Sequence, residues 1–105
     1  MTLQEFETGL KDACPDLVYE LAAPKGAKRA VVWNVYGRSH LTGDDRNQLG
    51  APKVQIDIFT QSTLDILVDD VGAALWTMGI PYTVESEGYD PEYCCRRTIL
   101  QMVVI

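Results

Sequence analysis

The stretch KVQIDIFTQ at residues 53–61, followed directly by STLDILVDDVGAALWTMG at 62–79, decides how the rest of the chain must fold. In the first part, Val54, Ile56 and Ile58 alternate with polar residues, and this period of two predicts a half-buried β-strand. In the second part the apolar residues take the spacing of one face of an α-helix, namely Leu64, Leu67, Val68, Val71, Leu75 and Met78. We therefore expect a helix that packs across a sheet.

Both ends of this helix carry end signals. Ser62 is a good N-cap residue, and Asp65 follows three positions later, as in a capping box. At the other end, Gly79 suits the left-handed position after a helix, Ile80 suits the hydrophobic contact that goes with it, and Pro81 prevents the helix from continuing. These signals predict a helix that occupies most of residues 62–79.

Length and composition describe an ordinary globular protein. A chain of 105 residues can fill one hydrophobic core, so we expect a single domain over residues 1–105. The chain is 47% hydrophobic and 23% charged, which argues against disorder. It has no apolar run near the ~20 residues of a membrane span, and its first residues lack the features of a signal peptide. We expect an intracellular protein without a membrane partner.

The charges and the cysteines exclude two kinds of site. The formal net charge is −6, and the basic pairs at 28–29 and 96–97 are isolated, which disfavours binding to phosphate backbones. The chain has three cysteines, two of them adjacent at 94–95, and this is not the spacing of a zinc site. Free thiols are the simplest interpretation.

The remaining elements follow from similar patterns. Thr2 with Glu5 predicts a capped first helix, which Pro15 ends. Besides the strand at 53–61, alternation predicts strands at 16–22, 29–37, 82–87 and 95–105, of which the first two should form a hairpin. The resulting order, α-β-β-β-α-β-β, predicts an α+β fold with two helices packed on a mostly antiparallel or mixed sheet.

The chain offers little for catalysis. His40 is the only histidine, and Ser39, Asp44 and Asp45 are near it, but all four lie in one long polar loop at 38–51, which cannot easily hold a catalytic triad. Glu85 and Glu87 should share one strand face, where two carboxylates could bind a metal, although a solvated face is the simpler interpretation. No phosphate-binding, dinucleotide or metalloprotease motif is present. We therefore predict no enzyme, no cofactor and no metal.

The outer side of the second helix is more informative. Ile66, Asp69, Ala73 and Trp76 lie away from the predicted core stripe, at about 100° per residue. An isoleucine and a tryptophan together on an outer face indicate a subunit interface. The alternative is that the loop at 38–51 or the first helix covers them.

Four segments in this order carry a family resemblance: AVVWNVY at 30–36, PKVQIDIFT at 52–60, LVDDVGAAL at 67–75 and RTILQMVV at 97–104. With the capped first helix, the long polar loop and the Gly-Ile-Pro turn, they resemble the tail terminator or tail completion proteins of long-tailed bacteriophages and prophages. The chain is similar in this respect to the lambda-type tail terminator.

The resemblance implies an α+β protein that assembles into a ring, usually a hexamer. Such a ring caps the tail tube, ends tail polymerisation and provides the head–tail joining surface, and DNA passes through its centre without specific binding. The implied partners are further copies of the chain, the tail tube protein and the head–tail connector protein. The implied location is the host cytoplasm during assembly and then the virion tail. An acidic lumen would repel DNA phosphates, which suits the net charge of −6.

In this interpretation the outer helix face, Ile66, Asp69, Ala73 and Trp76, is the candidate subunit interface. The long loop provides candidate contacts to a neighbour or to the tube, at Arg38, His40, Asp44, Asp45 and Arg46. The chain could also stay monomeric until it meets the tube. The alternatives are another minor tail or neck protein, and a small α+β ligand-binding or regulatory module, which would need a pocket.

Overall fold

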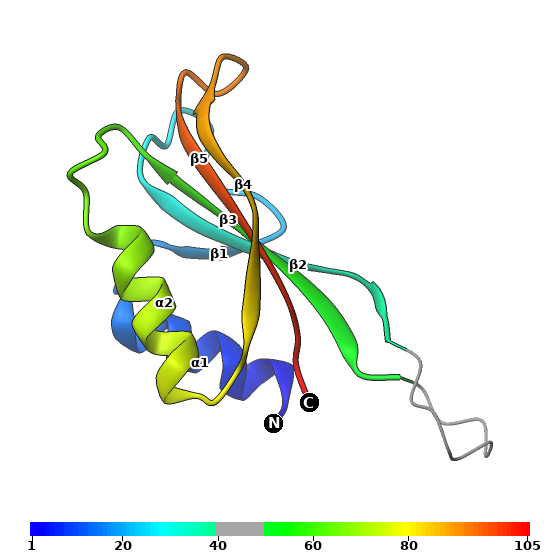
Figure 1. Cartoon of the computed structure of the whole chain (residues 1–105). Helices are drawn as coiled ribbons and strands as arrows, with labels where there is room; N and C mark the ends of the chain where they lie inside the picture. Colours follow the sequence, from blue (N-terminus) through cyan, green and yellow to red (C-terminus); the bar gives the residue numbers. More distant parts are fainter. Residues whose placement is uncertain (40–49) are drawn as a thin grey trace.

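Two helices lie on one face of a twisted five-stranded sheet in the computed structural model, which describes residues 1–39 and 50–105 (Figure 1). The element order is α-β-β-β-α-β-β, so the predicted α+β fold is confirmed. The elements are α1 (Leu3–Ala13), β1 (Val18–Glu20), β2 (Ala30–Arg38), β3 (Pro52–Thr60), α2 (Leu67–Thr77), β4 (Tyr82–Asp90) and β5 (Cys95–Val103).

The strands lie in the order β1-β2-β3-β5-β4, with β4 at one edge and the short β1 beside part of β2 at the other. All neighbours are antiparallel except β1 and β2, which are parallel. The expected hairpin of the first two strands is therefore wrong. Because β1 has only three residues, about 10 Å at 3.3 Å per residue, the segment 21–29 can return beside it without a crossover helix. Leu21, with φ of 71°, turns the chain away directly after β1.

The main core lies between the helices and the sheet. The alternation in β3 and β5 is as predicted, since their buried side chains on this face come from every second residue. Phe6 of α1 meets Trp33 of β2 edge to face, with ring centroids 5.7 Å apart, and the Trp33 indole N–H donates to Glu7 at 3.1 Å. The fully buried large side chains are Phe6, Leu10, Val31, Val54, Ile56, Ile58, Leu67, Val71, Leu75, Leu100 and Val104.

A smaller cluster occupies the opposite face of the sheet. It is formed by Ala30, Val32, Phe59 and Cys95, with Tyr19 and Ala23 packed against it. The predicted strand at 29–37 is apolar on both faces because the main core lies on one side and this cluster on the other.

The ends of α1 and the C-terminal end of α2 follow the predictions. Thr2 and Glu5 form the capping box of α1. After α2, Gly79 has φ of 73°, and the N–H groups of Gly79 and Ile80 donate to the carbonyls of Trp76 and Leu75, which is the Schellman pattern. Ile80 is buried, as this ending requires.

The start of α2 differs from the prediction. Ser62 does not cap the helix, which begins at Leu67 after Ile66. Asp65 accepts the N–H of Leu67 at 3.0 Å, and its two carboxylate oxygens accept from Nε and Nη2 of Arg29, at 2.8 and 3.0 Å. This pairing holds residues 62–66 in turns before the helix. As a result Leu64, predicted to be in the core, is 88% exposed.

Candidate functional site

The outer face of α2 is exposed, as its sequence pattern predicts. Trp76 is 86% and Ile66 61% exposed, and Asp69 and Ala73 between them are also exposed. At about 100° per residue these four positions fall within one quarter of the helix circumference. Ile66 and Trp76 lie near opposite ends of α2, about 15 Å apart at 1.5 Å per residue. We call Ile66, Asp69, Ala73 and Trp76 the α2 outer face.

The first helix does not lie over this face, since the groove between α1 and α2 touches it only at Ala73. The other covering element of the alternative interpretation, the loop at 38–51, lies largely outside the described residues. The role of the face as an interface stays a prediction. Leu64, displaced from the core by the late start of α2, adds a further exposed apolar side chain two residues before Ile66. The sequence pattern could not have shown this, because Leu64 fits the core stripe of the helix.

An open groove lies beside Trp76, where α2 ends and β4 begins. Its volume is about 530 Å³, and it is lined by Gly72, Trp76, Gly79, Ile80, Pro81 and Tyr82. The Tyr82 ring end lies against α2 at Gly72, where a Cβ atom would be 2.8 Å from Tyr82 Oη. Glycine at 72 therefore permits this contact between α2 and β4.

Of the five predicted loop contacts, Arg38 is within the described residues. Its side chain is exposed and donates to the carbonyl of Gly50 at 3.1 Å. His40, Asp44, Asp45 and Arg46 lie outside the described residues. The predictions for these four residues therefore stay predictions.

Both edges of the sheet offer unpaired backbone among the described residues, and the two unpaired stretches meet only at the level of Val35 and Tyr82. β1 pairs with Val31, Val32 and Trp33 only, so no described strand pairs with the outer side of β2 from residue 34 to 38. On the other edge, β4 pairs with β5 alone among the described strands. Seven of its nine residues are exposed. In Figure 1 the end of β2 and the start of β3 extend away from the helices.

The two glutamates of β4 do not share a face, contrary to the expectation. A bulge between Val84 and Ser86 interrupts the alternation. Glu85 accepts the hydroxyl of Thr83 at 3.0 Å, whereas Glu87 lies opposite Thr98, which alternates with the core residue Leu100. The two carboxylates are thus not arranged as a pair of metal ligands.

A polar network on the helix-free face centres on Arg97. The guanidinium donates to Asp57 at 2.6 Å and to Asp90 at 3.1 Å, and its carbon lies 5.3 Å from the centroid of the Tyr93 ring. Partial burial alone would raise the pKa of Asp90, but hydrogen bonds from Arg97 and from the backbone N–H groups of residues 92 and 93 lower that pKa overall. This network joins β3, β4 and β5.

The network continues along the same face through side-chain amides. Gln55 donates to Asp57 at 2.9 Å, and Gln101 donates to Gln55 at 3.2 Å. The Tyr36 hydroxyl donates to Gln101 at 3.4 Å. A connected row of polar groups thus crosses β2, β3 and β5 on the face that carries no helix, and sequence reasoning missed it because the partners are far apart in the chain.

A small cavity of about 300 Å³ lies at one end of the helix-free face. Residues 21–27 form one side of it, and Val32, Phe59 and Tyr93 give it an apolar floor, with Asp57 at its margin. The rings of Phe59 and Tyr93 are 5.0 Å apart. This is the described feature that most resembles a small-molecule pocket.

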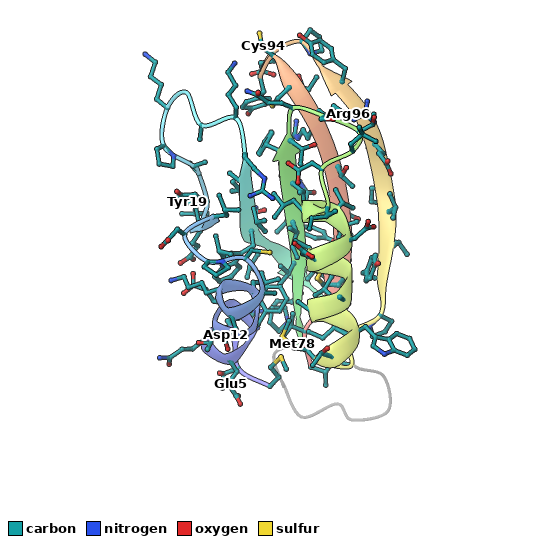
Figure 2. All side chains as sticks on the ribbon, turned by 90° about the vertical axis from the view of Figure 1, so that its left-hand side faces the viewer. Glu5, Asp12, Tyr19, Met78, Cys94 and Arg96 are labelled. Atoms are coloured by element: carbon teal, nitrogen blue, oxygen red, sulfur yellow. The ribbon has the colours of Figure 1, made fainter. Side chains whose placement is uncertain are left out.

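Cysteines and other potential ligands are scattered. The three thiols are free, with Cys14 and Cys95 buried and Cys94 exposed. Burial raises the pKa of both the Cys14 and the Cys95 thiol. Figure 2 shows Cys94 at the tip of the β4–β5 hairpin, far from Glu5 and Asp12 of α1. Within residues 1–39 and 50–105, no three His, Cys, Asp or Glu side chains gather to hold a metal ion.

Within residues 1–39 and 50–105, no helix is both long and apolar enough to cross a membrane.

Comparison with protein-family models gives no match for this chain, and neither does comparison with curated proteins.

Proposed function

We propose that this protein is a structural subunit of a long-tailed phage or prophage, which forms a ring that caps the tail tube. The ring ends tail polymerisation and provides the surface for head–tail joining, and the subunit performs no catalysis. Its partners are further copies of itself, the tail tube protein and the head–tail connector protein. It acts in the host cytoplasm during assembly and then in the virion tail.

The observation that carries this proposal is the exposure of Trp76 on the α2 outer face. Trp76 is 86% exposed and Ile66 61% exposed on a well-formed helix. Burying one aromatic side chain removes about 150–250 Å² from water, a gross gain of about 4–6 kcal/mol at 25 cal/mol per Å², from which the entropy and ordering costs of association are subtracted. Covering this face therefore gives a hydrophobic contribution that can offset part of the cost of association, which supports an assembly protein over a chain that works alone.

The charge supports the same proposal. The net charge of −6 disfavours retention of DNA on the protein surface. A ring through which DNA passes needs this property, because a basic lumen would bind the phosphates and slow the passage.

The direct test is polymerisation of the tail tube protein of the same phage, with and without this chain. Under the proposal, substoichiometric amounts of the chain stop tube growth, and electron microscopy finds it at one end of each tube. Trp76→Glu should reduce capping at least tenfold, whereas Leu21→Glu should cap normally, because Leu21 is also apolar and 73% exposed but lies on another surface. Tubes that grow to the same length with or without the chain would contradict the proposal.

The cavity of about 300 Å³ favours a second candidate, a small ligand-binding module. In that case an apolar aromatic probe such as indole should shift the ring resonances of Phe59 and Tyr93, and Tyr93→Ala should abolish the shift. A module of this kind would leave tube growth unchanged. The same two assays therefore separate the two candidates.

A further inference from the structure

We propose that the groove between α2 and β4 receives an amphipathic helix of another protein, one that carries an apolar stripe together with lysine or arginine side chains. This inference deepens the proposed function, on which it rests for the identity of the assembly, because it states what chemistry a partner other than a second copy must present. The groove is the one beside Trp76, and it continues along the helix side of β4. All the residues that carry the argument lie within the described ranges.

The helix layer is too narrow to cover the whole sheet. Packed helices lie about 8–10 Å apart and neighbouring strands about 4.8 Å apart, so each helix covers about two strands. α1 lies against β1 and β2, with Phe6 on Trp33, and α2 lies over β3 and β5 (Figure 2). The fifth strand, β4, is at the edge beside α2 with no described helix over it. The layer therefore has room for a third helix at this position.

The helix side of β4 is apolar where it borders the groove. Tyr82 lies opposite Met102 and Val84 opposite Leu100, and both of these partners belong to the main core. Side chains of directly opposite residues lie on the same face of a sheet, so Tyr82 and Val84 point toward the helix layer. Tyr82 is 40% and Val84 55% exposed. Both side chains are thus on the side of the core but lack a helix that covers them.

α2 supplies the other wall of the groove. At about 100° per residue, Asp69, Gly72 and Trp76 fall within about 60° of the helix circumference. This side of α2 faces β4, because a Cβ atom at Gly72 would be 2.8 Å from Tyr82 Oη. Trp76 is 86% exposed and lines the groove together with Tyr82. Trp76, Tyr82 and Val84 therefore form one apolar surface across both elements, of the kind that marks an interaction site.

Acidic residues border this surface. The segment from residue 54 to residue 95, which contains α2 and β4, has no lysine, arginine or histidine. Its acidic residues are Asp57, Asp65, Asp69, Asp70, Glu85, Glu87, Asp90 and Glu92. Asp57, Asp65 and Asp90 pair with arginines, whereas no ion pair within the described residues involves Asp69 or Glu87. The groove is therefore apolar with an acidic border.

Asp69 and Glu87 lie toward the same end of the groove. Asp69 is two helical turns before Trp76, about 10 Å away along α2 at 1.5 Å per residue. Glu87 lies opposite Thr98 and so follows Val84 on the helix side of β4. Because α2 and β4 run in opposite directions (Figure 1), both carboxylates lie away from the turn that joins the two elements. A partner helix should place apolar side chains near that turn and basic side chains toward the other end.

Charge argues against a second copy of this chain as the occupant. The helices within the described residues are α1 and α2. α1 has three acidic residues and one basic residue, and α2 has two acidic residues and no basic residue. Either helix of a second copy would bring carboxylates against Asp69 and Glu87, which is destabilising. A basic helix of a different protein has the complementary charge.

A designed peptide tests the inference on the intact chain. The probe has about 14 residues, about four helical turns, with leucine at the spacing of one helix face and lysine at the other positions. Two matched peptides accompany it. One has glutamate in place of every lysine, and the other has the same composition but alternates leucine and lysine, as in a strand. Binding is followed by the indole N–H resonances of the two tryptophans.

The two tryptophans give an internal control. Trp76 is 86% exposed and lines the groove, whereas Trp33 is 4% exposed and donates its N–H to Glu7. The helical leucine–lysine peptide should shift the Trp76 resonance to saturation and leave that of Trp33 unchanged. The matched peptides should each bind at least about tenfold more weakly, and added salt should weaken the binding. No Trp76 shift up to about 1 mM peptide, or equal binding of the alternating peptide, would overturn the inference.

Charge-reversal variants separate this contact from general attraction of a cationic peptide. Asp69→Lys should weaken binding of the leucine–lysine helix about fivefold or more. Glu92→Lys makes the same change in net charge at an exposed position in the β4–β5 hairpin and should have no such effect. The double variant Asp69→Lys, Glu87→Lys should instead bind the leucine–glutamate helix, a gain that loss of the fold cannot produce. Equal weakening by Asp69→Lys and Glu92→Lys would contradict the inference.

Oligomeric state and tube growth separate this inference from the proposed function. If light scattering finds wild-type oligomers that are lost in Trp76→Glu, the occupant of the groove is a second copy, and the inference is overturned. Tube capping by that chain would still support the proposed function. Conversely, a chain that binds the leucine–lysine helix in the groove but leaves tube growth unchanged would overturn the proposed function and leave this inference standing.

Discussion

Replacement of Gly72 by alanine tests the contact between α2 and the first residue of β4. Alanine is favoured over glycine in a helix interior by about 0.8–1.0 kcal/mol, so Gly72→Ala would stabilise an isolated α2 by that amount. In the folded protein the new Cβ atom would be 2.8 Å from Tyr82 Oη, and the Tyr82 ring must move. Tyr82 is 40% exposed, so the ring can move but loses its packing on the helix.

We therefore expect Gly72→Ala to change the free energy of unfolding by less than about 0.5 kcal/mol, since the helix gain offsets the lost contact. Tyr82→Phe provides the control. Without the hydroxyl, the nearest ring atom is the Cζ carbon at 3.8 Å, an ordinary van der Waals distance. In this background Gly72→Ala should stabilise by the full amount of about 1 kcal/mol.

Urea unfolding of the four proteins, followed by circular dichroism at one concentration, gives the coupling energy of the double-mutant cycle. The expected coupling is about 0.5 kcal/mol or more. The reasoning is refuted if Gly72→Ala stabilises the wild-type protein and the Tyr82→Phe variant equally, because the hydroxyl would then not contact α2.

Three further predictions concern ion pairs and thiols. Arg29→Gln should destabilise by about 0.5–1 kcal/mol near neutral pH, a small value because Arg29 is half exposed. Arg29 lowers the pKa of Asp65 below its ordinary 3.8. The difference in unfolding free energy between wild type and Arg29→Gln should therefore be complete above pH 3.8 and disappear as the pH falls through the pKa of Asp65 in the folded protein. A difference in urea midpoints that does not change with pH would argue against the pair. Asp57→Ala should lower the free energy of unfolding by about 1–3 kcal/mol, because it leaves Arg97 without its closest partner. Adding Arg97→Met should recover part of this loss, and a double variant that is no more stable than Asp57→Ala in thermal unfolding would contradict this explanation. A disulfide reagent should modify Cys94 quickly and the two buried thiols only at the rate of unfolding, and a second fast thiol would disagree with the burial.

The sequence predicted correctly the features that depend only on residues close together in the chain. The alternation in β3 and the Schellman ending at Gly79 need only neighbouring residues, and both are confirmed. The start of α2 depends on Arg29, which is 36 residues away from Asp65 in the chain. A rule based on Ser62 and the residues after it could not include this partner.

The same limit applies to the candidate site. The exposure of Trp76 follows from helical angles alone and was predicted correctly. Strand order and direction depend on the path of the whole chain, so the parallel pairing of β1 and the free edge of β4 could not be read from alternation. The Arg97 network joins residues 40 positions apart, and its members look like ordinary solvated polar residues in the sequence.

The three-residue length of β1 determines how much of β2 is paired on its outer side. β1 runs parallel to β2 and stops opposite Trp33. In terms of hydrogen exchange, the outer side of β2 should therefore show two rates. The Val31 N–H donates to the carbonyl of Leu17 and should exchange slowly, whereas the Val35 N–H, with which no described strand pairs, should exchange quickly with deuterium in the solvent. Two more residues of strand would protect Val35 as well.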